Sequence, residues 1–106
     1  MAKYMFAGTF SASGIAGVRK DGGTSRTKAV AKLAKSVGGS LESYHFAFGS
    51  DDFFVIVDLP DNAAAAATAM AVAESGAVSV RTVVLLTPEE VDAAAKLKPA
   101  YKAPGA

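Results

Sequence analysis

Residues Leu41–Pro60, LESYHFAFGSDDFFVIVDLP, decide the fold. They predict two strands joined by a tight turn near Gly49–Asp52. Successive side chains of a strand point to opposite faces of a sheet, so a half-buried strand alternates apolar and polar residues. In this hairpin apolar residues occupy both the odd-numbered and the even-numbered positions, and Phe53–Val57 is apolar without interruption. A sheet built from such strands needs cover on both of its faces.

The sequence on either side of the hairpin supplies two more strands and three helices. The spacing of apolar residues predicts strands over 3–10 and 77–86 and helices over 24–37, 61–73 and 88–96. Gly38 ends the first helix, Asp61 caps the second, and Thr87 opens a capping box for the third. The glycine-rich segment 11–23 is expected to hold a short helical turn.

The predicted order of elements, β-α-β-β-α-β-α, is that of an α+β protein with a ferredoxin-like fold (βαββαβ) and an additional C-terminal helix. Such a fold has a four-stranded antiparallel sheet with helices on one face. We expect a single domain over 1–98 and a C-terminal tail over 99–106. Because the second face of the sheet is apolar but has no helices to cover it, we expect a homo-oligomer, dimeric or higher, or an enclosed pocket.

The composition argues against several classes of protein. The 106 residues include no cysteine, carry a formal net charge of +1, and contain no apolar run long enough to cross a membrane. We therefore expect no disulfide, no cofactor and no membrane association. The balanced charge argues against nucleic-acid binding, which favours a basic surface. RNA-recognition domains of this topology carry their base-stacking aromatic motif on the third strand, whereas the aromatic motif here is on the second. The N-terminus has the pattern of a strand and not of a signal peptide, which makes the cytoplasm the expected location.

His45 is the only histidine and the first candidate catalytic residue. It is expected in a strand beside Tyr44 and Phe46, where apolar neighbours disfavour the charged imidazole. A neutral imidazole facing a cavity could act as a general base or bind a ligand. The simpler interpretation is a structural histidine with one satisfied hydrogen bond. A metal site is not expected, because there is no second histidine or cysteine to serve as a ligand.

Asp52 and Arg81 are the other candidate ligand-binding residues, together with Tyr44. Asp52 follows Asp51 at the predicted turn, where aspartates ordinarily accept backbone hydrogen bonds. Arg81 interrupts an apolar strand and could pair with a carboxylate across a dimer or bind an anion. Further basic residues flank the glycine-rich segment, but its spacing matches no phosphate-binding loop. They are expected to face solvent: Arg19, Lys20, Arg26, Lys28, Lys32 and Lys35.

Three segments, TSRTKAVAKLAKSVGG, FAFGSDDFFVIVDLPDNAAAAA and LLTPEEVDAAAK, resemble the GYD-domain family of small bacterial proteins. The family is named for a glycine, a tyrosine and an aspartate at the hairpin turn. Gly49 and Asp52 match the glycine and the aspartate, whereas Asp51 stands in place of the tyrosine. The resemblance implies a ferredoxin-like subunit similar to those of dimeric α/β-barrel proteins. It does not imply an activity.

The sequence thus predicts a homo-oligomer that associates through its sheet and acts as a small-molecule-binding or interaction protein. The expected ligand is small and apolar or aromatic, held between sheet and helices or between subunits. Two alternatives remain open. One is a cofactor-free oxygenase or isomerase of the dimeric α/β-barrel type, with His45 and either Tyr44 or Asp52 lining its pocket. The other is a purely structural subunit of a larger assembly.

Overall fold

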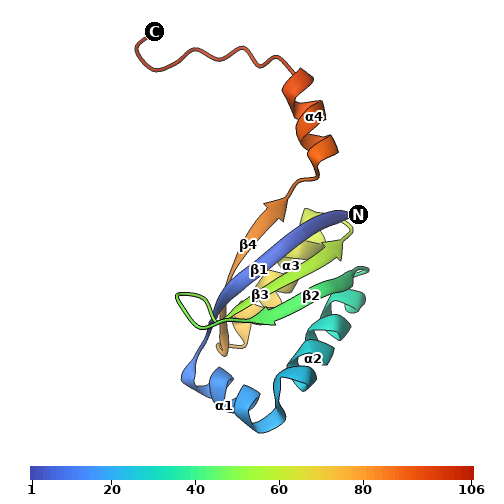
Figure 1. Cartoon of the computed structure of the whole chain (residues 1–106), viewed down its shortest axis with the longest axis vertical. Helices are drawn as coiled ribbons and strands as arrows, with labels where there is room; N and C mark the ends of the chain where they lie inside the picture. The colour runs from blue at the N-terminus through green and yellow to red at the C-terminus, as the bar shows by residue number, and fades with distance from the viewer.

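Four strands form one antiparallel sheet in a computed structural model that describes all 106 residues. The strands are β1 (Ala2–Phe10), β2 (Ser40–Phe46), β3 (Phe53–Leu59) and β4 (Val78–Leu85), and their order across the sheet is β2-β3-β1-β4. The helices are α1 (Ala12–Asp21), α2 (Gly23–Ser36), α3 (Asn62–Glu74) and α4 (Pro88–Lys96). The predicted α+β ferredoxin-like fold is confirmed, with one helix more than expected (Figure 1).

The hydrophobic core lies on one face of the sheet, beneath α2 and α3. Alternate residues of the two central strands point into it, as the period of a strand requires. These residues are at most 6% exposed: Tyr4, Phe6, Phe53, Val55, Val57 and Leu59. Ala34 of α2 and Ala65 of α3 pack against them from the helical layer. Both helices therefore cover the same face, and the other face has no helix over it.

The start of α3 forms as the sequence predicts. Asp61 caps the helix by accepting a hydrogen bond from the backbone N–H of Ala64 at 2.9 Å. In the first turn, Asn62 accepts a hydrogen bond of 2.7 Å from the buried hydroxyl of Tyr4, which ties the helix to β1. Most of the following residues are alanines, whose small side chains favour a helix and allow it to lie close to the sheet.

The glycine-rich segment forms a ten-residue helix, α1, instead of the predicted short turn. The Ser11 hydroxyl caps it by accepting from the N–H of Gly14 at 3.2 Å. A Cβ on Gly14 would lie 2.2 Å from the carbonyl oxygen of Ala77, so glycine is what allows α1 to approach the start of β4. Because glycines lower helix propensity, they concealed this helix in the sequence.

The connection between β2 and β3 is longer than the predicted tight turn. It covers residues 47–52, and Phe48 within it is fully exposed to solvent and not part of a strand. Asp52 holds the returning chain against the end of β1. Its backbone N–H donates to the carbonyl of Gly8 at 2.7 Å, and its carboxylate accepts from the N–H of Phe10 at 3.0 Å. These bonds to β1 set the length of the connection.

The C-terminal segment from Leu86 onward projects from the body of the protein, and we call it the C-terminal arm (Figure 1). The predicted capping box is present, since Thr87 and Glu90 exchange side-chain to backbone hydrogen bonds at the start of α4. No residue of α4 is buried. The radius of gyration is 16.8 Å, whereas a compact chain of this length would have one of about 13 Å.

Gly8 and Gly17 offer a matched test of where the backbone is closely packed. A Cβ on Gly8 would lie 1.8 Å from the carbonyl oxygen of Ser79 on the neighbouring strand, whereas a Cβ on Gly17 would meet nothing within 4 Å. We expect Gly8→Ala to lower the free energy of unfolding by about 3 kcal/mol through overpacking. Gly17→Ala should raise it by about 0.5–1 kcal/mol through helix propensity. Urea unfolding of both variants measures this, and an unchanged midpoint for Gly8→Ala would contradict the close approach of β1 and β4.

Candidate functional site

The uncovered face of the sheet, which we call the open face, has an apolar centre. Three side chains that are paired across β3, β1 and β4 form it: Ile56, Met5 and Val83. Phe54 and Leu85 extend this apolar area toward the two ends of the sheet. All five are at least partly exposed in a single subunit. An exposed apolar area of this kind is a candidate surface for contact with another molecule.

Ion pairs lie at both ends of the open face. At one end Lys3 contacts Glu42 of β2 and lies 3.0 Å from the carboxylate of Asp58 on β3. Hydrogen bonds to Glu42 and then to Asp58 raise the pKa of Lys3 above its usual value. At the other end Arg81 lies 3.1 Å from the carboxylate of Asp51. Each cation of the open face thus has a carboxylate partner within the subunit, and the apolar centre lies between the two charged groups.

His45 and Tyr44 are adjacent in β2 and therefore lie on opposite faces of the sheet. His45 is exposed on the open face, opposite Phe54. Tyr44 is opposite Val55 and faces the helical layer, where its ring lies 4.8 Å from that of Phe46. Within one subunit the two side chains cannot line the same cavity. A site built on His45 would have to lie at the open face.

Asp52 and Arg81 also have partners within the chain. The carboxylate of Asp52 accepts a hydrogen bond from the end of β1, as a turn aspartate is expected to do. Arg81 pairs with Asp51 of its own subunit. Of the four predicted ligand-binding residues, His45 and Arg81 share the open face, Tyr44 lies under the helices and Asp52 lies at the strand ends.

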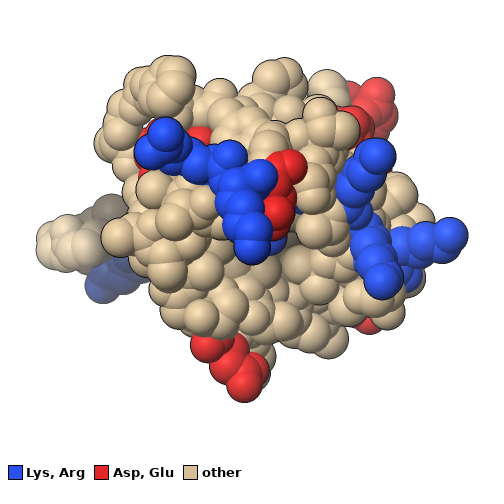
Figure 2. Space-filling model, turned by 90° about the horizontal axis from the view of Figure 1, so that it is seen from below, with Lys and Arg blue, Asp and Glu red and all other residues tan.

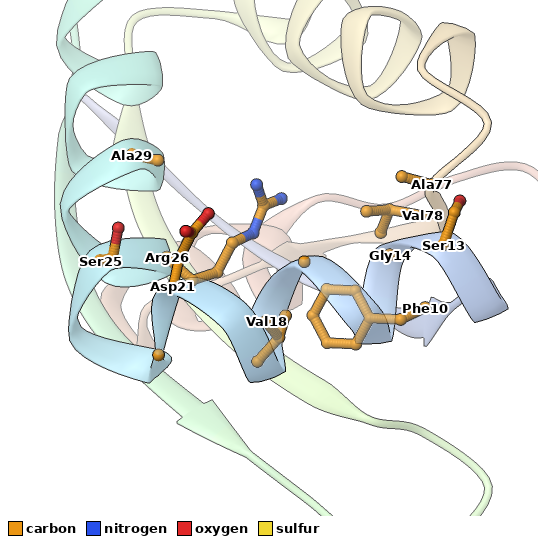
Figure 3. A pocket seen from close by; sticks show the side chains of 12 residues that line it. Phe10, Ser13, Gly14, Val18, Asp21, Ser25, Arg26, Ala29, Ala77 and Val78 are labelled. Carbon is orange, nitrogen blue, oxygen red and sulfur yellow. The ribbon is translucent and has the colours of Figure 1, made fainter.

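A cleft of about 260 Å³ lies where α1, α2 and the start of β4 meet, and we call it the Arg26 cleft (Figure 3). Its walls combine apolar, small and polar residues. They are Phe10, Ser13, Gly14, Gly17, Val18, Asp21, Gly22, Ser25, Arg26, Ala29, Ala77 and Val78. Around this end of the molecule, acidic and basic side chains are interspersed among uncharged atoms (Figure 2). The cleft is therefore a local feature and not part of a large charged surface.

Arg26 is the one cationic residue that lines the cleft. Its side chain extends from the first turns of α2 toward the space in front of Ala77 and Val78 (Figure 3). The Nε atom is buried and has no hydrogen-bond partner. A buried polar atom without a partner costs free energy of folding, about 1–3 kcal/mol.

Arg26 also borders a small apolar cavity of about 40 Å³ between the sheet and the helices. This inner cavity is lined mostly by core residues, and Tyr44 and Thr68 are its polar members besides Arg26. Burial raises the pKa of the Tyr44 phenol above its usual value, and the neighbouring Arg26 guanidinium offsets part of this rise. Arg26 thus separates an outer, mixed cleft from an inner, apolar one.

Arg26 was wrongly expected to face solvent with the other basic residues of this region. Lys28, Lys32 and Lys35 are indeed exposed, but Arg26 is partly buried. The sequence contained the signal for this difference. Arg26 precedes Val30 by four residues and Leu33 by seven, which places it on the apolar side of the helix.

The other kinds of site have less support. No group of three or more acidic or histidine side chains converges to form a metal site. None of the four helices combines the length and the hydrophobicity that a membrane span requires.

Comparison with known proteins identifies one family. The family model described as the GYD domain matches residues 4–95. No curated protein and no solved structure matches the chain. The match includes nearly all of β1 and α4 and every element between them, and therefore both the apolar centre of the open face and the Arg26 cleft.

Replacing Tyr44 with phenylalanine should make the protein more tolerant of alkaline pH. The pKa of Tyr44 is raised in the folded protein, so the unfolded chain loses this phenolic proton first as the pH rises past 10.0. The contribution of Tyr44 to stability is therefore complete below that pH and is lost as the pH rises toward the folded-state pKa. Urea unfolding at pH values from about 9 to 11 should show a shallower loss of stability for Tyr44→Phe than for the wild type.

Tyr101→Phe is the control for this comparison, because Tyr101 is exposed in the C-terminal arm. It should keep the wild-type dependence on pH. Equal slopes for the wild type and Tyr44→Phe would show that Tyr44 is not in a desolvated site.

Proposed function

The chain belongs to the GYD domain family, and from its open face and its Arg26 cleft we propose that it is a homo-oligomeric small-molecule-binding protein whose subunits associate through their open faces. The observation that carries this proposal is the apolar centre of the open face, formed by Met5, Ile56 and Val83. An apolar sheet face in water is costly, and a second copy of the same face is a self-complementary cover for it.

The energy available from such a contact is sufficient for a stable dimer. Burying roughly 600–800 Å² of apolar surface on each subunit at about 25 cal/mol per Å² gives on the order of 15–20 kcal/mol per subunit before the costs of association. Lys3 and Arg81 already have carboxylate partners within the subunit. Burial of the face would therefore enclose no isolated cation, which lowers the desolvation cost.

The C-terminal arm adds support for association. Its helix α4 has nine residues and no buried side chain, and isolated helices of this length are marginal in water. Val91 and Leu97 are both more than half exposed. A second subunit would provide the cover that the arm does not obtain from its own chain.

Ligand binding is supported by the Arg26 cleft. The space of about 260 Å³ next to an arginine without a carboxylate partner favours a binding protein over a purely structural subunit, whose interior would be solid. An oxygenase or isomerase with His45 and Tyr44 in one pocket has less support, because these side chains lie on opposite faces of the sheet.

A charge at the centre of the open face should separate the subunits. Ile56→Lys would place an unpaired ammonium at the middle of the proposed contact, and we expect the dissociation constant to rise by roughly thirtyfold or more. Sedimentation equilibrium measures the constant.

Native mass spectrometry of gently purified wild-type protein should show an even oligomer that retains a small molecule.

Met70→Lys is the matched control. Met70 is 69% exposed on α3, in the helical layer on the other side of the sheet. This variant should associate like the wild type, and circular dichroism should show that both variants remain folded. A wild-type protein that is monomeric at micromolar concentration, or equal dissociation of the two variants, would contradict association through the open face.

A further inference from the structure

We propose that the ligand of the Arg26 cleft is a small organic monocarboxylate with an apolar body, and that the Arg26 guanidinium binds its carboxylate. This inference rests on the proposed function as a small-molecule-binding protein and names the class of its ligand. It follows from the charge, the lining and the size of the cleft.

The charge of Arg26 indicates an anionic ligand. No acidic side chain forms an ion pair with Arg26, although Asp21 also lines the cleft. The Nε atom is buried without a partner. A guanidinium presents its donors in a planar fork that matches the two oxygens of a carboxylate. A carboxylate bound in the cleft would accept hydrogen bonds from the terminal Nη groups of this fork.

Asp21 limits the charge of that ligand. Its carboxylate lies at the same corner of the cleft as Arg26, where α1 meets α2 (Figure 3). A dianion such as a phosphate monoester would be repelled by Asp21 more strongly than a monocarboxylate would. The two side chains together favour a ligand with a single negative charge.

The rest of the cleft wall indicates an apolar body of limited size. Phe10, Val18 and Val78 supply apolar surface beside Arg26. Gly17 leaves open space, because a Cβ built on it meets nothing within 4 Å. A volume of about 260 Å³ lies just below the usual range for drug-sized ligands and is sufficient for a single ring or a short chain.

Sodium benzoate is a suitable probe, because it joins one carboxylate to one apolar ring. We would titrate it into the full-length, isotope-labelled protein and follow the backbone amides by two-dimensional NMR. The expected result is a saturable shift of amides in residues 13–29 and 77–78. Benzyl alcohol has the same ring without the charge and should bind at least about tenfold more weakly, and inorganic phosphate should also bind more weakly than benzoate.

Two variants test the site and a third is the control. Arg26→Gln removes the charge and should weaken benzoate binding by at least about tenfold. Gly17→Leu keeps Arg26 but fills the open space, and should weaken binding to a similar extent. Lys32→Gln removes an exposed charge from the same helix and should leave binding unchanged.

Equal benzoate affinity in the wild type and a folded Arg26→Gln variant would overturn the inference, as would tighter binding of phosphate or of benzyl alcohol. Sedimentation equilibrium on the same samples separates this result from a failure of the proposed association. An intact dimer that does not bind benzoate would overturn only the ligand class. A wild-type monomer that binds benzoate through Arg26 would support the ligand class and contradict the association.

Discussion

The two long helices that pack on the sheet reach only one of its faces, and the other features of the molecule depend on this imbalance. β1 lies between β3 and β4, and each of these strands has apolar residues on both sides. The face toward α2 and α3 becomes the core, while the same pairing places Met5, Ile56 and Val83 together on the face toward solvent. When paired strands bury the side chains on one face of the sheet, the same pairing also brings the side chains on the other face side by side. The open face is thus a direct product of the strands that make the core.

The sequence was sufficient to predict this architecture, because the signals for it are local. The periodicity of the apolar residues located all four strands and the helices α2, α3 and α4, and the caps at Asp61 and Thr87 form as expected. The predictions that failed depend on contacts between distant segments. α1 forms where glycines suggested a turn, since Gly14 allows it to lie against Ala77. The connection after β2 is long because Asp52 is bound to the end of β1.

The candidate site was less predictable than the fold for a related reason. Residue type singled out His45, the only histidine, but did not show which face of the sheet it would occupy. The strand pairing places His45 on one face of the sheet and Tyr44 on the other. Arg26 drew no attention as one of several basic residues near a glycine-rich segment. Its importance depends on the position of α1, which forms one wall of the cleft and was not predicted as a helix.

The projecting C-terminal arm has a practical consequence for determining the size of the protein in solution. A radius of gyration of 16.8 Å is that of a compact globule of about 210 residues, roughly twice the length of this chain. A monomer with its arm extended would therefore elute from a gel-filtration column close to the position of a compact dimer. If the arms fold against the partner on association, the true dimer would be only slightly larger than the monomer. Retention volume would then hardly change with concentration, and methods that measure mass directly, such as light scattering, are needed to observe association.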